Sequence, residues 1–124
     1  MKFASFKIDN SATWGLVDGE AIADVGALLR ARLVDLKSAI AAGALSEAAA
    51  MAAKARRYPL ANIGWLPVIP NPDKILCIGL NYEMHRKETG RSEVENPTVF
   101  GRFANSQTGH LTNNPAARLD RSRL

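Results

Sequence analysis

His85 and Glu88 are the residues whose types and spacing point most directly to chemistry. They lie three positions apart in residues 79–90, a segment that predicts a glycine turn and then a short helix over 82–89. On a helix this spacing places both side chains on one face, where a carboxylate can orient an imidazole and raise its basicity. Such a pair can act as a general base, but it also occurs as a solvated surface pair, and the spacing alone leaves both interpretations open.

Other common catalytic and cofactor motifs are missing from the sequence. Neither a P-loop nor a G-x-G-x-x-G follows any predicted strand, so the two common nucleotide-binding signatures are excluded. A zinc site built from cysteine and histidine is not expected, because the chain has one cysteine, Cys77, and two histidines, His85 and His110, that are 25 positions apart. The polar segment around His85 is therefore the remaining candidate for a functional site.

Two predicted strands flank this segment and must position it. Residues 74–80 contain the uninterrupted apolar run from Ile75 to Ile78, which is typical of a strand covered on both faces. Pro97 precedes a second expected strand over 98–100. A buried strand, a glycine turn and a short polar helix commonly carry functional groups to the mouth of a fold.

The first 25 residues predict a small antiparallel meander. Apolar residues occur over 3–8, a turn is expected at 9–11, and further strands are expected over 13–17 and 20–25. A meander of this size needs something packed on its apolar face to be stable.

Helical patterns follow the meander and begin at residues 26–32. Asp35 is expected to cap a helix over 36–42, and Gly43 to end it in the left-handed conformation. Ser46 is expected to cap an alanine-rich helix whose last turn holds Lys54, Arg56 and Arg57. Because alanine buries little apolar area, we expect this helix to cover the surface. The proline-rich residues 58–72 predict an extended connector.

The composition excludes several classes of protein. A chain of 124 residues with one cysteine is no disulfide scaffold, and a reducing cytoplasm is the expected location. Residues 1–10 lack an uninterrupted apolar run, and the prolines of 58–72 prevent a spanning helix, so no secretory signal and no membrane association are expected. The net charge of +4 resides mainly in residues 101–124, with four arginines against one aspartate, which argues against a nucleic-acid-binding face.

The central segment resembles the fumarylacetoacetate hydrolase family. The matching residues are the run from Pro70 to Tyr82, then His85, Glu88, Thr89 and Gly90, then Pro97, Phe100, Arg102 and the loop 106–109. The resemblance covers about residues 1–111 and is specific for the family, not for one substrate. It implies an α+β fold: a small strand and helix domain of the type found in bacterial members over 1–69, the opening strand, helix and loop of a β-rich catalytic domain over 70–111, and a divergent basic tail over 112–124.

The resemblance also implies roles for four residues. In this family a divalent metal, usually magnesium, chelates the oxygens of a β-diketo or oxo-acid substrate. His85 and Glu88 match the N-Y-x-x-H-x-x-E pattern as a general base and its orienting partner that activate water or move a proton. Arg102 matches a basic residue near the substrate's acidic group, and a surface arginine closing a strand is the alternative. Tyr82 matches a pocket residue, and an aromatic packed on the strand is its alternative.

The C-terminal residues depart from the family pattern. Where the family continues to an acidic D-x-E-x-E-L metal motif, Ser122 and Leu124 occupy the places of the two carboxylates. Hard cations need oxygen ligands, so no metal is expected to bind this chain alone. Because few later strands follow residues 74–80, we also expect an exposed apolar surface, with aggregation or dependence on a partner as its consequence.

The sequence thus predicts part of a metal-dependent enzyme that hydrolyses, decarboxylates or isomerises small β-diketo or oxo acids, with the isolated chain inactive. Whether the chain is itself an enzyme is left open. The alternative is a non-catalytic binding or regulatory module that associates with a complete family member. A second copy of the chain and a complete homologue are the expected protein partners.

Overall fold

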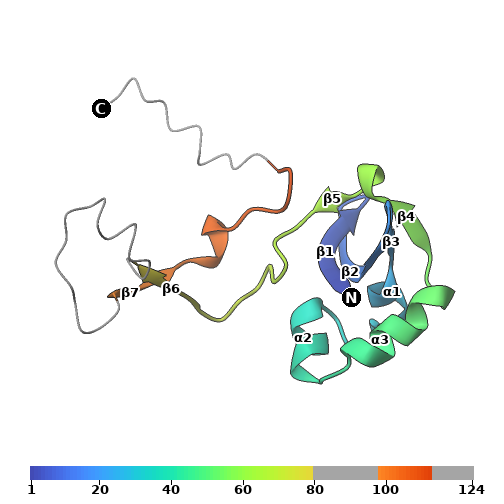
Figure 1. Ribbon diagram of the computed structural model, residues 1–124, viewed down its shortest axis with the longest axis horizontal. Coiled ribbons are helices and arrows are strands. Elements are labelled where there is room, and N and C mark those ends of the chain that lie inside the picture. Colours follow the sequence, from blue (N-terminus) through green and yellow to red (C-terminus); the bar gives the residue numbers. More distant parts are fainter. Residues whose placement is uncertain (80–97, 113–124) are drawn as a thin grey trace. The chain divides into compact units, whose positions relative to one another are not determined.

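The computed structural model describes residues 1–79 and 98–112 (Figure 1). Strands and helices are mixed in it, which confirms the predicted α+β class. The described residues divide into two compact units, one of residues 1–71 with 107–112 and one of residues 72–79 with 98–106. The predicted domain limits of 1–69, 70–111 and 112–124 stay predictions. In the part of the chain that is described, no helix has the length and apolar composition to cross a membrane.

The first unit is built on a five-stranded antiparallel sheet. Its strands are β1 (Lys2–Ile8), β2 (Ser11–Asp18), β3 (Ala21–Ala23), β4 (Arg57–Pro59) and β5 (Gly64–Trp65), in the order β4-β3-β2-β1-β5. The predicted meander of the first three strands is confirmed. Asp9 and Asn10 connect β1 to β2 with φ angles of 47° and 67°, as a type I′ turn requires, and Asp and Asn tolerate this conformation well.

The sheet curls, because its two edge strands are close in the sequence. Pro59 of β4 and Gly64 of β5 are joined by the 3₁₀ turn η2 (Leu60–Asn62). The edges of a flat five-stranded sheet are about 19 Å apart, more than this short turn can span. The prediction of an extended connector over 58–72 was therefore wrong for the residues of β4 and β5. The three residues of β4 pair with β3, and the two residues of β5 pair with β1.

Strand alternation divides the apolar side chains between two cores. Trp14 anchors the core on one face of the sheet, together with Ala23 and residues of the helices. Phe6 anchors the other core, inside the curl, with Ala4 and Ile22. The register accounts for this division, since directly opposite residues of an antiparallel pair share a face, as Phe6 and Thr13 or Ser5 and Trp14 do.

The first helix, α1 (Val25–Leu29), begins earlier than predicted. Residues 20–25 were expected to form one strand, but β3 ends at Ala23, because the Asp24 carboxylate caps the helix by accepting a hydrogen bond from the Ala27 N–H (3.0 Å). Thr13 Oγ1 donates to the same carboxylate oxygen (2.6 Å). Val25 is thus helical, and the cap fixes α1 against β2.

The second helix, α2 (Leu36–Ala41), confirms its predicted start and end. Asp35 is the N-cap, and its carboxylate accepts from the Ser38 N–H (2.7 Å) while Ser38 Oγ accepts from the Asp35 N–H (3.1 Å), which forms a capping box. Gly43 follows the helix with φ 63°, the left-handed conformation expected there.

The alanine-rich helix α3 (Leu45–Met51) differs from its prediction in two respects. Its N-cap is Ala44, so Ser46 lies within the first turn and does not cap the helix. It passes into the 3₁₀ helix η1 (Ala52–Lys54), so that Arg56 and Arg57 lie beyond it. Within α3, Ala48 is buried in the core with Trp14 while Ser46 and Glu47 are exposed, as expected for a helix that covers the core at the surface.

A Cβ atom at Gly15 is expected to disrupt the sheet. It would lie 2.0 Å from the Ala23 carbonyl oxygen, a backbone atom of the paired strand that cannot move aside alone. Gly15→Ala should therefore lower the free energy of unfolding by about 2–4 kcal/mol in urea denaturation. Gly101→Ala is the matched control, since its Cβ would meet only the Ile75 carbonyl oxygen at 4.0 Å. Equal stability of the two variants would contradict the close approach of β2 and β3.

Residues 66–71, which follow β5, are hydrogen-bonded at both of their ends to other residues of the first unit. The Leu66 N–H donates to the Ser5 carbonyl oxygen (3.1 Å), and Ser5 Oγ donates to that of Val68 (2.7 Å). Further along, Asn71 Nδ2 donates to Asp35 Oδ2 (2.8 Å) and Lys37 Nζ to the Asn71 carbonyl oxygen (3.2 Å). These bonds hold the segment against β1 and the start of α2.

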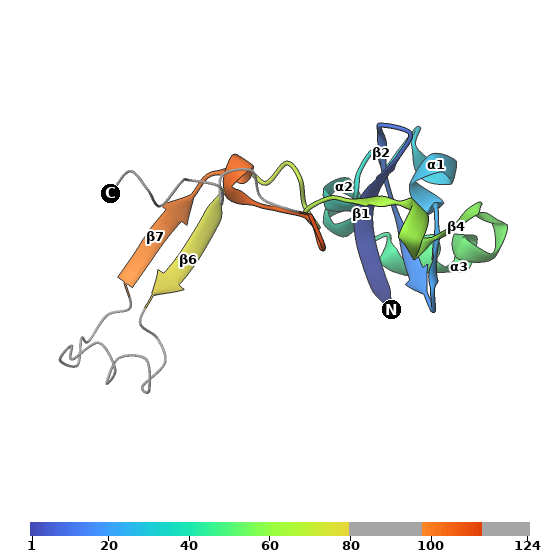
Figure 2. The ribbon, with the colours of Figure 1, turned by 90° about the horizontal axis from the view of Figure 1, so that it is seen from above.

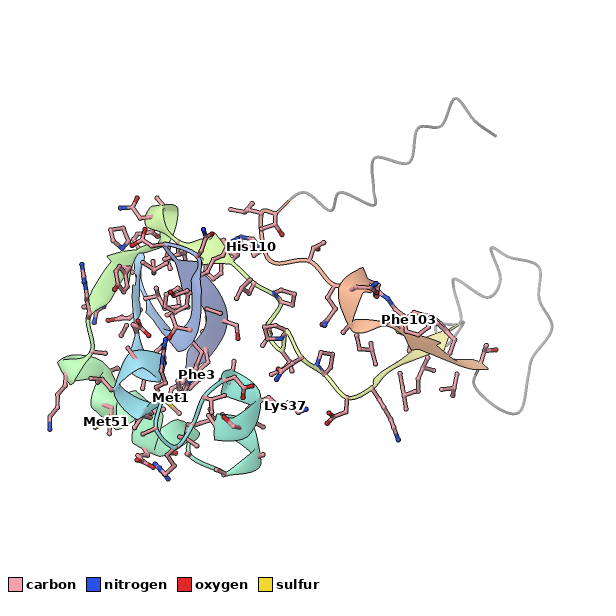
Figure 3. All side chains as sticks on the ribbon, turned by 180° about the vertical axis from the view of Figure 1, so that it is seen from behind. Met1, Phe3, Lys37, Met51, Phe103 and His110 are labelled. Atoms are coloured by element: carbon pink, nitrogen blue, oxygen red, sulfur yellow. The ribbon has the colours of Figure 1, made fainter. Side chains whose placement is uncertain are left out.

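Residues 107–112 return to this unit and pack on its last strand. Gln107 Nε2 donates to the Ile69 carbonyl oxygen (3.2 Å). The His110 ring meets the Trp65 ring edge-on, with centroids 5.5 Å apart (Figure 3). This edge-to-face geometry is a favoured one for aromatic rings.

The stability of the first unit should depend on the charge of Asp35. The backbone N–H of Ser38 holds the pKa of Asp35 below its ordinary value, with smaller contributions from Asn71 and Lys37. A lowered folded-state pKa gives stability that is present above the unfolded value, near 3.9, and is lost as the pH falls through the folded value. Asp35→Ala should cost about 1 kcal/mol at pH 7 in urea unfolding. This difference should shrink below about pH 4, and a constant difference would contradict the assignment.

Candidate active site

The second unit consists, in its described residues, of a hairpin and a short turn. Strands β6 (Ile75–Gly79) and β7 (Thr98–Arg102) pair antiparallel, with Gly79 opposite Thr98 and Ile75 opposite Arg102 (Figure 2). The 3₁₀ turn η3 (Ala104–Ser106) follows. Both predicted strands are confirmed, and β7 extends to Arg102.

One face of this hairpin is apolar and open to solvent. Leu76, Ile78 and Val99 share it, because opposite residues of the pair point to one side, and they are 69%, 57% and 56% exposed. Phe103, just beyond β7, is also exposed (Figure 3). The predicted exposed apolar surface is confirmed. The sequence predicted that β6 is covered on both faces. Among the described residues, 1–79 and 98–112, no element covers this face of β6.

Arg102 closes the far end of the hairpin. Its Nη2 donates to the Ser106 carbonyl oxygen (2.8 Å) and its Nε to Ser106 Oγ (3.2 Å), while Ser106 Oγ donates to the Phe103 carbonyl oxygen (2.7 Å). These bonds tie the end of β7 to η3. A guanidinium has five N–H donors, so Arg102 retains donors that could bind an anionic group.

The other three predicted site residues, His85, Glu88 and Tyr82, lie outside the described residues. The segment that contains them leaves the hairpin at Gly79 and rejoins it at Thr98, one pair of directly opposed residues. Arg102 is four residues further along β7, about 13 Å at the rise of a strand. The structure thus places both ends of the described hairpin that flank this segment, Gly79 and Thr98, at one end of the hairpin and Arg102 at the other.

The described residues do not fit a metal ion. Within 1–79 and 98–112, no three His, Cys, Asp or Glu side chains are grouped so that they could hold one. Divalent magnesium and calcium require a set of oxygen ligands, carboxylates above all.

Two contacts of the described residues were missed by sequence reasoning. Ser106 was assigned only to the loop 106–109, but it is the partner of Arg102. Asn71, in the run Pro70-Asn71-Pro72, was not assigned a contact, but it bonds Asp35 at the start of α2. An asparagine between two prolines has restricted backbone freedom, which was the available signal for a fixed side-chain bond.

Known proteins resemble this chain in sequence and in fold. A mitochondrial oxaloacetate tautomerase of Rattus norvegicus is 37% identical over 60 residues, which are 48% of this chain and 19% of the relative. A homologue of fumarylacetoacetate hydrolase domain-containing protein 2 in Dictyostelium discoideum is 41% identical over 54 residues, 44% of this chain and 17% of that protein. A crystal structure described as an HpcE protein from Mycobacterium smegmatis has a TM-score of 0.62 and 28% identity, and covers 85% of this chain and 37% of that one. The resemblance to the fumarylacetoacetate hydrolase family is thereby confirmed.

The chain matches a limited part of each similar protein of the fumarylacetoacetate hydrolase family. The chain spans about a fifth of the length of the curated relatives it matches. No protein-family model matches the chain. Enzymes of the fumarylacetoacetate hydrolase family use a divalent metal, for which the described residues supply no ligand group.

Proposed function

We propose that this chain supplies the small N-terminal domain and the first strands of the catalytic domain of a fumarylacetoacetate hydrolase-type enzyme that acts on a small oxo acid. The observation that carries the proposal is the hairpin β6–β7, which holds both ends of the segment with the N-Y-x-x-H-x-x-E pattern. Oxaloacetate is the favoured substrate, since several similar proteins are described as oxaloacetate tautomerases. Hydrolysis and decarboxylation are the alternative reactions, in which His85 could act as the base in the same way.

In the proposed reaction His85 moves a proton. It takes a proton from the carbon next to the keto group, the C–H electron pair becomes the carbon–carbon double bond of the enol, and the carbonyl π pair moves to the oxygen, which receives the proton from the imidazolium. Glu88 is its positioning residue and fixes the orientation of the imidazole. For a hydrolytic substrate, the same imidazole would take the proton from water, and the hydroxide would add to the carbonyl carbon. The carbon–carbon bond at that carbon would then break as the carbonyl re-forms, and the departing enolate would take the proton back from the imidazolium.

Arg102 and Tyr82 are proposed to bind the substrate. The donors of Arg102 that Ser106 does not use suit a substrate carboxylate. Tyr82 would supply an aromatic wall of the pocket.

The isolated chain is proposed to be inactive, because the family's metal needs carboxylate ligands that its described residues do not group together. Magnesium belongs to the proposal only for a complete enzyme. A cytoplasmic location also remains a proposal, supported by Cys77, which is a free thiol.

A second candidate function is association with a complete family member as a non-catalytic or regulatory module. The apolar face of Leu76, Ile78 and Val99 favours it, because exposed apolar patches on soluble proteins commonly mark protein–protein contacts. A complete homologue or a second copy of this chain is the proposed partner.

Both functions can be tested in one assay of oxaloacetate keto–enol interconversion and acylpyruvate hydrolysis with magnesium. The samples are the chain alone, a complete relative alone, and the two mixed. We expect the chain alone to be no faster than buffer, and the mixture to match the relative. Turnover by the chain alone would contradict its inactivity, and a changed rate of the relative would favour the regulatory module.

A further inference from the structure

A small cavity lies in the first unit. Its volume is about 190 Å³, and its lining comes from β1, β2, the start of α2 and the segment 66–71. Ser5, Trp14 and Leu36 are buried and form its floor, while Ala12, Val34 and Asn71 are exposed and form its mouth. The cavity is thus open to a ligand from solution.

The walls of this cavity are mainly apolar, and their polar donors are already used. Trp14 Nε1 donates to the Leu33 carbonyl oxygen (3.2 Å), Ser5 Oγ to that of Val68 (2.7 Å), and Thr13 Oγ1 to Asp24 (2.6 Å). A ligand would therefore meet the Trp14 ring, Leu36, Leu66 and Pro70 as hydrophobic surface.

Asp35 contributes the charged group of the lining. Its Oδ1 accepts from the Ser38 N–H (2.7 Å) and its Oδ2 from Asn71 Nδ2 (2.8 Å). A carboxylate has about four lone-pair sites, so it can accept a further hydrogen bond from a ligand. The bonds to Ser38 and Asn71 also lower the pKa of Asp35, which keeps it ionised at neutral pH. Lys37, on the same turn, bonds Asn71 at 3.2 Å and weakens the attraction of this carboxylate for cations.

We propose that this cavity binds a small organic cation, an aromatic ring with a short ammonium-bearing arm. The ring would lie among Trp14, Leu36 and Leu66, and the ammonium group would donate to Asp35. An apolar cavity of about 150 Å³ accepts benzene, so about 190 Å³ has room for one ring and a short arm. A ligand of this size is expected to bind with a Kd on the order of 1–10 mM.

The test titrates the full chain, labelled with ¹⁵N, with benzylammonium and separately with its neutral analogue benzyl alcohol. Saturable shifts of the Trp14 indole and Val34 amide signals are expected with benzylammonium, and at least fivefold weaker binding of benzyl alcohol. The absence of saturable shifts up to about ten times the expected Kd would overturn the proposal. Equal affinity for both compounds would overturn the role of Asp35.

Two variants test separately the charge of Asp35 and the access of a ligand to the cavity. Asp35→Asn keeps an acceptor for the Ser38 N–H and should remove the preference for benzylammonium over benzyl alcohol. Ala12→Trp places a bulky side chain at the exposed mouth and should abolish binding of both compounds. Unchanged binding to the Ala12→Trp protein would place the ligand elsewhere and overturn the proposal. If either variant fails to fold, the titrations of the unaltered chain with the two compounds still decide whether the cavity binds the cation and whether its charge matters.

Discussion

Truncating Trp14 to Ala is expected to lower the free energy of unfolding of the first unit by about 3–5 kcal/mol. Trp14 is 1% exposed and touches the core residues contributed by the sheet and by the helices. Its ring lies 6.2 Å from that of Phe3, centroid to centroid, and its Nε1–H satisfies the buried Leu33 carbonyl oxygen. The truncation therefore leaves a cavity and an unsatisfied acceptor at once.

Urea denaturation followed by far-ultraviolet circular dichroism measures this loss for the Trp14→Ala protein. Leu28→Ala is the matched control, because Leu28 is 45% exposed on α1 and its truncation should cost less than about 1 kcal/mol. If the two variants lose the same stability, Trp14 is not the anchor of this core.

Replacing His85 by Ala is expected to have the largest effect on catalysis. The context for this test is a chimera in which residues 1–111 of this chain replace the matching N-terminal part of a complete oxaloacetate tautomerase. There His85→Ala should lower kcat/KM about 10²–10⁴-fold, the usual contribution of a general base. Glu88→Gln should give a smaller loss, since Glu88 is proposed to orient the base and not to touch the substrate.

His110→Gln is the control for this loss, because His110 packs on Trp65 in the first unit and is not part of the hairpin. Its kcat/KM should stay within about twofold of the parent chimera, as expected for a surface substitution. A His85→Ala chimera that is folded and fully active would remove His85 from the mechanism.

Short sequence patterns predicted the structure correctly where it depends on a few neighbouring residues. The strands of the meander, the cap at Asp35 and the left-handed Gly43 were predicted because alternation, capping and positive φ each depend on a few neighbouring residues. The strands at 75–79 and 98–102 followed from their apolar runs in the same way.

The features that could not be predicted depend on contacts between residues that are far apart in the sequence or on the path of a turn. β5 consists of Gly64 and Trp65 alone, and only its pairing with Phe6 and Lys7 makes it a strand. The burial of Ala48 in α3 could not be foreseen from the sequence, because it depends on the core around Trp14 of β2. At the candidate site, the bonds of Arg102 depend on the turn that brings Ser106 back to it.

The most direct test of the central claim is the rate of oxaloacetate enolisation by the unmutated chimera with magnesium. We predict turnover within about tenfold of the complete relative, because residues 1–111 would supply the dyad on hairpin β6–β7 and the relative's remaining chain would supply the metal ligands. A chimera that folds, as judged by circular dichroism and a cooperative thermal transition, but is no faster than buffer would contradict the claim that this chain is the N-terminal part of such an enzyme.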